Sequence, residues 1–152
     1  MCGIIGFSGY ERATDVLLAG LSALEYRGYD SAGISCFTKD GAITTIKSVG
    51  KVSELKALVP GELASGCGIG HTRWATHGGV SRENAHPHAC GRVTLIHNGI
   101  IENYLPLRDE LTSDGRIPVS ETDSEVAAML LDSLYEGDAH AAIAAAAARL
   151  EG

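Results

Sequence analysis

Apolar residues recur along the chain with two spacings, which predict a mixture of strands and helices. Residues 3–8 are mainly apolar and lack helix formers, so we expect a short buried strand. Residues 15–26 carry leucines at helical spacing, and Arg27-Gly28 ends this predicted helix. The chain is therefore expected to begin with a strand followed by a helix.

The next part of the pattern predicts a β-hairpin. Two alternating runs, 33–38 and 42–47, flank an Asp40-Gly41 pair. Asp-Gly between two such runs favours a tight hairpin turn. A short helix is expected to follow at 52–58, because Pro60-Gly61 ends the apolar pattern there.

Strand and helix signals alternate again in the second half. Residues 67–73 and 92–97 resemble strands, and a polar loop rich in glycine and histidine separates them. A helix is predicted at 103–111, where Pro106 is tolerated only in the first turn.

The residues 122–125 read Thr-Asp-Ser-Glu, which is the pattern of a capping box. It leads into a helix with Val126, Leu130 and Leu134 on one face. A last helix is predicted at 139–150. These elements predict one α/β domain whose strands are largely antiparallel, with helices packed outside them.

Composition narrows the class of protein. The chain has 152 residues, 45% of them hydrophobic, and a net charge of −7 without a basic run. Such a chain can bury one core, and its acidic balance argues against a nucleic-acid partner. The apolar segments are too short for a secretory signal or a membrane span, so we expect a cytoplasmic protein. Its four cysteines show no close pairing and do not form a disulfide framework.

Cys2 is a candidate nucleophile because of its position. Removal of Met1 would leave a thiol and a free α-amine on the same carbon. The amine titrates near about 8 and the thiol near about 8.5, so the amine can take the proton of the thiol. The alternative is that Cys2 is a small hydrophobic residue at the start of a strand.

Residues 71–78 leave a strand end and offer a cation, hydroxyls, imidazoles and a tryptophan, as a recognition loop for a small polar ligand would. The planar guanidinium of Arg73 can clamp a carboxylate through two parallel hydrogen bonds. The alternative is an ordinary surface loop with a packed Trp74.

Two further polar groups follow. Asn98-Gly99 suits an oxyanion hole, because glycine lets the backbone approach a ligand and asparagine adds a donor. The same pair is also common in tight turns. Asp123 could bind an ammonium group, or it could simply complement a helix N-terminus.

The sequence gives little support for a metal or a cofactor. His86, His88 and Cys90 do not have the spacing of a zinc site, and no second ligand pair completes one. Gly68-x-Gly70 lacks the third glycine of a dinucleotide-binding loop. We therefore predict no metal and no cofactor.

Taken in order, these blocks resemble the class II glutamine amidotransferases, whose glutaminase domains are N-terminal-nucleophile hydrolases. The Trp after Arg73 and the segment 86–88 separate the chain from the purine-pathway and asparagine-synthetase branches. Together, the sequence blocks are similar to the branch that delivers ammonia to fructose 6-phosphate. The resemblance is carried by residues 2–6, 25–33, 71–78, 84–88, 97–103 and 120–123.

The resemblance implies a role for each matching residue. Cys2 would attack the side-chain amide of glutamine, and Asn98 and Gly99 would hold the oxyanion. Arg73 would bind the α-carboxylate of glutamine and Asp123 its α-ammonium group. The remaining expected residues are Trp74 on a loop that closes over glutamine, Thr76 and His77 in the pocket, and Arg27, Gly28 and His86 in support.

The implied fold is α+β: an αββα sandwich of mostly antiparallel sheets flanked by helices. The family's domain continues beyond residue 152, so we expect residues 2–152 to be a glutaminase domain that is incomplete at its C-terminus. Fructose 6-phosphate would bind only to sugar-isomerase domains outside this chain, and the full-length enzyme would be a homodimer. The alternatives are a glutaminase that supplies another acceptor, and an inert glutamine-binding fragment.

Overall fold

The computed structural model describes residues 1–152 except 11, 39, 62, 64, 76 and 77. By its internal contacts the chain divides into two compact units, Met1–Pro87 and His88–Gly152. We call them unit 1 and unit 2 and describe each by itself.

Unit 1 contains a four-stranded sheet in the order β1-β4-β2-β3, in which every neighbouring pair is antiparallel. The predicted strands at 3–8 and 67–73 are confirmed at both ends. The predicted hairpin is also confirmed, with Gly41 at a φ of 84° in its turn, although its strands are displaced by up to two residues. The strands are β1 (Gly3–Ser8), β2 (Ser31–Phe37), β3 (Ile43–Val49) and β4 (Cys67–Arg73).

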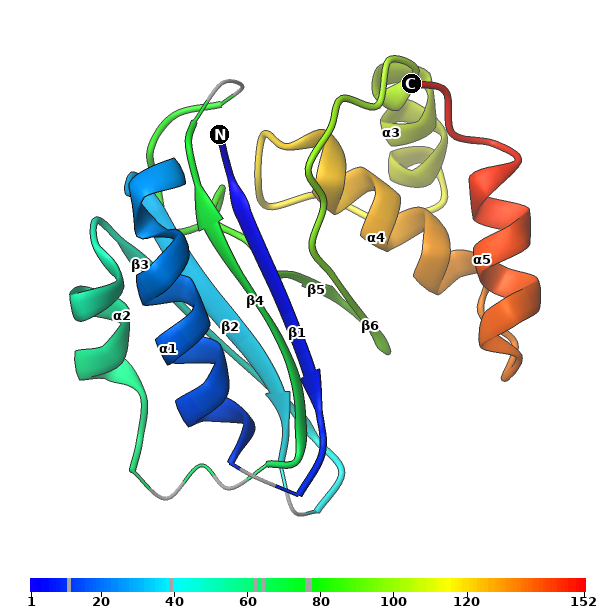
Figure 1. Ribbon diagram of the computed structural model, residues 1–152. Coiled ribbons are helices and arrows are strands. Elements are labelled where there is room, and N and C mark those ends of the chain that lie inside the picture. Colours follow the sequence, from blue (N-terminus) through cyan, green and yellow to red (C-terminus); the bar gives the residue numbers. More distant parts are fainter. Residues whose placement is uncertain (11, 39, 62, 64, 76–77) are drawn as a thin grey trace. The chain divides into compact units, whose positions relative to one another are not determined.

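Two helices cover one face of this sheet (Figure 1). Helix α1 (Ala13–Leu24) begins and ends two residues earlier than predicted and is followed by a short 3₁₀ turn, Glu25–Arg27. Helix α2 (Val52–Leu58) has the predicted bounds. Glycine at 68 and 70 of β4 leaves room for leucines of α1, which pack directly on the strand. The buried residues of this core include Leu17, Leu21, Ile34, Cys36, Val52 and Leu55.

Polar side chains of β4 are buried in unit 1 as well. His71 is fully buried, and its ring stacks on that of His86 with a centroid separation of 4.3 Å. The chain at His86 also lies close to β2, because a Cβ added at Gly33 would collide with the carbonyl oxygen of His86. The segment before residue 87 therefore packs against the middle of the sheet.

Unit 2 is built around helix α4, which contacts both strands of a small hairpin and two other helices (Figure 1). The prediction of a strand over 92–97 is only partly right, because β6 ends at residue 95. The strand β5 was not predicted, since three residues are too few to show an alternation. The elements are β5 (His88–Cys90), β6 (Val93–Leu95), α3 (Tyr104–Ser113), α4 (Asp123–Leu134) and α5 (Ala139–Ala147).

Half of the predicted capping box is present at the start of α4. The Thr122 hydroxyl accepts a hydrogen bond from the backbone N–H of Glu125 at 3.2 Å. The Glu125 carboxylate does not complete the reciprocal bond; it accepts from the N–H groups of Val119 and Ser120, at 3.1 and 2.6 Å. Glu125 therefore fixes the loop that precedes the helix, which the capping-box pattern did not predict.

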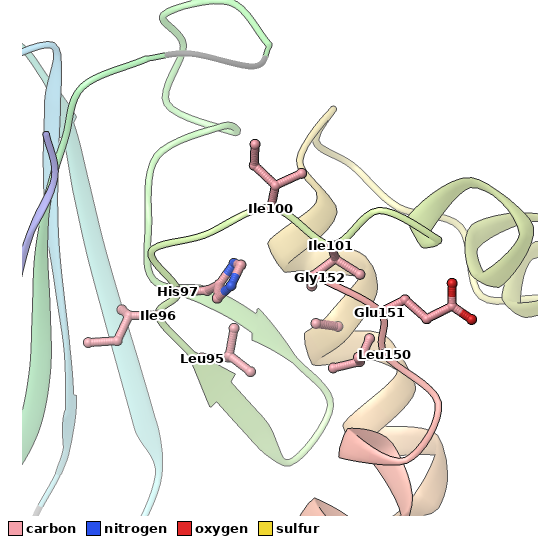
Figure 2. A pocket seen from close by; sticks show the side chains of 9 residues that line it. Leu95, Ile96, His97, Ile100, Ile101, Leu150, Glu151 and Gly152 are labelled. Carbon is pink, nitrogen blue, oxygen red and sulfur yellow. The ribbon is translucent and has the colours of Figure 1, made fainter.

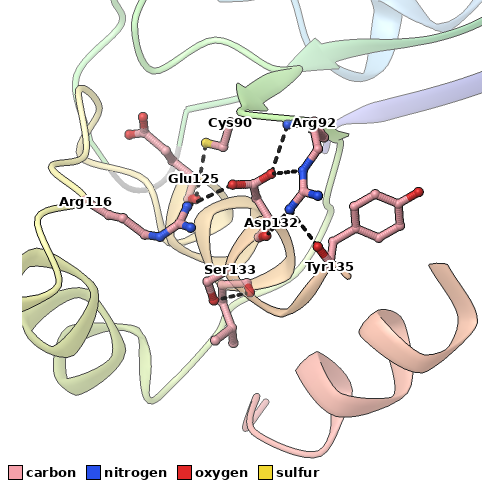
Figure 3. A network of polar contacts seen from close by, with 8 residues as sticks. Cys90, Arg92, Arg116, Glu125, Asp132, Ser133 and Tyr135 are labelled. Carbon is pink, nitrogen blue, oxygen red and sulfur yellow. Dashed lines mark hydrogen bonds and ion pairs between the residues drawn. The ribbon is translucent and has the colours of Figure 1, made fainter. Parts of the chain in front are cut away.

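Asp132 near the end of α4 joins three parts of unit 2 (Figure 3). Its carboxylate accepts hydrogen bonds from the backbone N–H of Arg92 at 2.9 Å and from the Arg116 guanidinium at 2.8 Å. Gly91 makes this approach possible, because a Cβ there would lie 2.5 Å from the carboxylate oxygens. Burial alone would raise the pKa of Asp132, but the hydrogen bonds and charges of Arg92 and Arg116 outweigh it and lower the pKa.

Among the described residues, no helix is both long enough and apolar enough to cross a membrane.

Candidate active site

The predicted site residues fall into two groups, one in each unit. Unit 1 contains Cys2, Arg27, Gly28, Arg73, Trp74 and His86, and unit 2 contains Asn98, Gly99 and Asp123. Thr76 and His77, which were also predicted to line the pocket, lie outside the described residues.

Cys2 lies beside the end of β4. The register of β1 pairs Gly3 with Thr72, which brings the half-buried Cys2 to the level of Arg73 and Trp74. Its Sγ accepts a hydrogen bond from the backbone N–H of Trp74 at 3.3 Å. The sheet therefore joins the candidate nucleophile directly to the predicted recognition loop.

Residues 27–30, which lead into β2, support this junction of Cys2 with the end of β4. The terminal amine on Met1 donates a hydrogen bond to the carbonyl oxygen of Arg27 at 2.7 Å. Gly28 is buried against the Arg73–Trp74 peptide, and a Cβ there would lie 2.9 Å from Arg73 C and Trp74 N. The supporting role of Arg27 and Gly28 stays a prediction.

Asp30 adds two hydrogen bonds that the sequence analysis missed. Its backbone N–H donates to the carbonyl oxygen of Arg73 at 3.0 Å, and its carboxylate accepts from the N–H of Ala75 at 2.8 Å. Asp30 thus holds the chain on both sides of Trp74. Its place in the block 25–33 was the available signal, because aspartate at a strand start readily accepts backbone N–H bonds.

The guanidinium of Arg73 is almost completely buried, with the residue 4% exposed. Nη1 donates to the carbonyl oxygen of Gly79 at 3.0 Å, and Nη2 donates to that of Gly78 at 3.5 Å. These bonds attach the guanidinium to the backbone of residues 78 and 79. The role of Arg73 in binding a carboxylate stays a prediction.

Trp74 is 44% exposed, and its ring contacts that of Tyr29. The two rings meet edge to face, with centroids 5.8 Å apart and planes at 75°. The contact with Tyr29 covers part of Trp74, and the alternative of an ordinary surface loop with a packed Trp74 stays open. Movement of the loop over a ligand stays a prediction.

In unit 2, Asn98 and Gly99 follow β6 and are exposed. Neither has a positive φ, so the pair does not form the type I′ turn that Asn-Gly often makes. A Cβ at Gly99 would lie 2.7 Å from Nε2 of His97, which shows how closely the His97 ring lies to Gly99. The pair thus lies at the surface of unit 2.

Asp123 is the first residue of α4 and is half-buried. Its Oδ2 accepts a hydrogen bond from the backbone N–H of Ile101 at 2.8 Å. Its Oδ1 accepts one from the Ser124 hydroxyl at 3.2 Å. Asp123 therefore ties the segment after Asn98-Gly99 to the helix, and its carboxylate oxygens keep lone pairs for an ammonium group.

A cavity of about 220 Å³ lies beside this segment in unit 2 (Figure 2). Most of its wall is apolar, so it is poorly suited to a ligand as polar as a free amino acid. The lining residues are Leu95, Ile96, His97, Ile100, Ile101, Ala127, Leu150, Glu151 and Gly152.

No cluster of histidine, cysteine or carboxylate side chains suitable for a metal ion occurs in the described part of the chain. Of the other cysteines, Cys36 is buried under α1, and burial, with a smaller effect of Cys67, raises the pKa of its thiol to about 11. A thiol of that kind stays protonated at neutral pH and is a poor nucleophile.

Comparison with protein families identifies the class. The model of the glutamine amidotransferase domain matches residues 53–142, which is more than half of the chain. The chain belongs to the glutamine amidotransferase family. The resemblance found in the sequence blocks is therefore confirmed.

Individual relatives agree with this assignment. The chain is 55% identical over 141 residues to the glutamine–fructose-6-phosphate aminotransferase (isomerizing) of Thermus thermophilus, covering 91% of this chain and 23% of that protein. It is 52% identical over 158 residues to the protein of the same name from Streptomyces coelicolor, covering 100% of this chain and 26% of that protein. The chain thus spans about a quarter of the length of these relatives.

Solved structures confirm the predicted α+β fold class of the amidotransferases. The glutamine phosphoribosylpyrophosphate amidotransferase of B. subtilis, complexed with ADP and GMP, matches with a TM-score of 0.83 and 27% identity over 100% of this chain and 33% of its own. A structure described as the allosteric regulatory enzyme of purine biosynthesis gives a TM-score of 0.83 and 30% identity, over 100% of this chain and 34% of its own.

Proposed function

We propose that this chain hydrolyses the side-chain amide of glutamine, with the thiol of Cys2 as the nucleophile. The observation that carries the proposal is the position of Cys2: its Sγ lies 3.3 Å from the backbone nitrogen of Trp74, the residue that follows the buried Arg73. A buried guanidinium in the residue before the one that the thiol contacts suits a substrate that carries a carboxylate. Membership of the glutamine amidotransferase family supplies the substrate class.

The chemistry uses the two groups that a processed terminus would carry. After removal of Met1, the α-amine of Cys2 takes the proton of the thiol, and the sulfur attacks the amide carbon. The Asn98 side chain and the Gly99 N–H stabilise the negative oxygen of the tetrahedral intermediate. The carbon–nitrogen bond breaks, ammonia leaves with the proton from the amine, and water hydrolyses the thioester to glutamate and free thiol.

Glutamine would be held through its charged α-substituents. Arg73 binds the carboxylate and Asp123 binds the ammonium group, each already fixed by hydrogen bonds to the backbone. Trp74, Thr76 and His77 line the pocket in this proposal, with Arg27, Gly28 and His86 in support. In this proposal residues 2–152 belong to a glutaminase domain whose C-terminal part lies outside this chain.

The use of the ammonia is a further part of the proposal. Both curated relatives described above are named for the transfer of nitrogen from glutamine to fructose 6-phosphate. We assign this chain to the half-reaction that releases the ammonia, with fructose 6-phosphate bound by domains outside it. A homodimeric full-length enzyme and a cytoplasmic location stay predictions.

The test is release of glutamate and ammonia from glutamine by the purified chain. Intact mass first establishes that Met1 has been removed. Cys2→Ala should abolish release, because in this proposal the thioester forms on the thiol of Cys2. Cys67→Ala is the matched control, since Cys67 is also half-buried in unit 1 but belongs to the far end of β4.

Each outcome separates the candidate functions. Release that depends on Cys2 supports a glutaminase, and the identity of the acceptor then requires the longer protein. Binding of glutamine without release would support an inert glutamine-binding chain. Release that is unchanged in Cys2→Ala would overturn the proposal.

A further inference from the structure

His97 joins two parts of unit 2 to which the proposed function assigns separate roles. It directly precedes Asn98 and lies half-buried after the end of β6. One edge of its ring faces α4, where Nδ1 lies 3.2 Å from the hydroxyl oxygen of Ser124. Its other edge lies against Gly99, where a Cβ would come within 2.7 Å of Nε2 and 3.1 Å of Cε1.

The hydrogen bonds around Ser124 determine which ring nitrogen of His97 carries the hydrogen. The Ser124 hydroxyl has one hydrogen, which it donates to Oδ1 of Asp123 at 3.2 Å. Its lone pairs then accept from His97, so the neutral imidazole carries its hydrogen on Nδ1. Ser124 is 2% exposed, so water does not compete for this bond.

The other carboxylate oxygen of Asp123 makes a second attachment to the same segment. Oδ2 accepts the backbone N–H of Ile101 at 2.8 Å, two residues after Gly99. The segment 97–101 is therefore attached to the start of α4 at both ends. The ring of His97 makes one attachment and the backbone of Ile101 makes the other.

We propose that His97 is a positioning residue for glutamine hydrolysis. Its ring sets Asn98-Gly99, the proposed oxyanion donors, at a fixed place relative to Asp123, the proposed ligand of the α-ammonium group. This proposal rests on the function proposed above and adds a residue that makes no contact with glutamine. Precise spacing matters because the two groups would bind opposite ends of one substrate molecule.

Two substitutions separate the two edges of the ring. In His97→Asn the amide stands near the position of Nδ1, so it keeps the bond to Ser124 but loses the contact with Gly99. In His97→Gln the amide stands near Nε2, so it keeps the contact with Gly99 but loses the bond to Ser124. Ser124→Ala removes the same bond from the other side.

The kinetics of glutamate release should divide accordingly. We expect His97→Asn to lower kcat about tenfold with little change in KM, because the oxyanion donors lose their support. We expect His97→Gln and Ser124→Ala to raise KM for glutamine about tenfold with little change in kcat. Ser124→Ala removes the hydroxyl that bonds to Asp123, and in His97→Gln this hydroxyl loses the ring nitrogen that holds it in place. His97→Ala should show both changes.

A purely structural role would produce a different result. All variants would then change kcat by similar factors and KM by similar factors, in parallel with a fall in melting temperature. That result would overturn the proposal. ¹⁵N NMR of the wild-type chain gives a second check: a hydrogen on Nε2 rather than Nδ1 of His97 contradicts it. Wild-type activity that depends on Cys2 but shows no division between the variants overturns this inference alone. A wild type without such activity overturns the proposed function as well.

Discussion

In unit 1 the candidate residues are held mainly by backbone atoms, whereas in unit 2 they are held by side chains. The thiol of Cys2 contacts the N–H of Trp74, and Gly28 packs on the peptide between Arg73 and Trp74. In unit 2, the carboxylate of Asp123 and the ring of His97 provide the attachments. A strand register tolerates changes of side chain, but a side-chain network fails when one member is replaced. We therefore expect the two halves of the candidate site to respond to different kinds of substitution.

The largest expected effect tests the side-chain half. In Asn98→Asp the side chain keeps its shape, but the NH₂ donor becomes a carboxylate oxygen. We expect kcat for glutamine hydrolysis to fall by about 10²–10³, the usual loss for one oxyanion-hole donor, with a smaller change in KM. Steady-state glutamate release checks this. A fall of less than about threefold would contradict the role of Asn98.

The second effect tests the backbone half. In Gly28→Ala the new Cβ would lie 2.9 Å from the backbone of Arg73 and Trp74, so this peptide must shift. We expect a loss of about 1–3 kcal/mol in the free energy of unfolding. Activity should also fall, because the shifted peptide is the one that contacts Cys2. Urea unfolding and glutamate release measure the two effects.

Gly6→Ala is the matched control in the same sheet, because a Cβ at Gly6 has no atom within 4 Å. It should change stability by less than about 0.5 kcal/mol. Equal effects of the two substitutions would show that unit 1 is not sensitive to the geometry at Gly28.

The smallest expected effect concerns a region of unit 2 outside the candidate site. It tests whether side chains stabilise the fold there as well. The pKa of Asp132 is lowered in the folded chain, so its contribution to stability is present at neutral pH. It is lost as the pH falls from the unfolded value of about 3.9 through the folded pKa. Asp132→Asn should therefore cost about 1 kcal/mol at pH 7, a low value because both arginines are partly exposed.

At pH values below the folded pKa the two proteins should differ little. Urea unfolding, followed by circular dichroism at pH 7 and at a pH below the folded pKa of Asp132, measures the difference in the free energy of unfolding. Asp109→Asn is the control, since Asp109 is exposed and its carboxylate pairs with the neighbouring Arg108, which is itself partly exposed. A difference between wild type and Asp132→Asn that does not depend on pH would contradict the assignment.

The sequence predicted most of unit 1 because its elements have clear local signals. The strands at 3–8 and 67–73, the hairpin at Gly41 and the helix at 52–58 each have a distinct pattern and a turn residue at the end. The hairpin of unit 2 was harder, since β5 has three residues and the apolar character beyond β6 belongs to the wall of a cavity instead. The carboxylate of Glu125 also accepts hydrogen bonds from backbone N–H groups outside the capping box, which the pattern did not predict.

The candidate site was predicted as residues but not as contacts. Motif blocks named Cys2, Arg73 and Asp123, because the chemistry of a thiol, a guanidinium and a carboxylate can be inferred from residue type. The hydrogen bonds of Asp30, His97 and Ser124 depend on which segments the fold brings together. Such tertiary contacts have no local pattern in a single sequence.

The end of unit 2 has a consequence for biosynthesis. The amide of Asn103 bonds to the carbonyl oxygen of Arg149 and the N–H of Glu151, and the N–H of Glu102 bonds to the carbonyl oxygen of Glu151. A ribosome delivers these partners more than forty residues after Asn103 itself, whereas β4 completes the first sheet by residue 73. During translation unit 1 can therefore fold before the residues that anchor Asn103 in unit 2 have been synthesised.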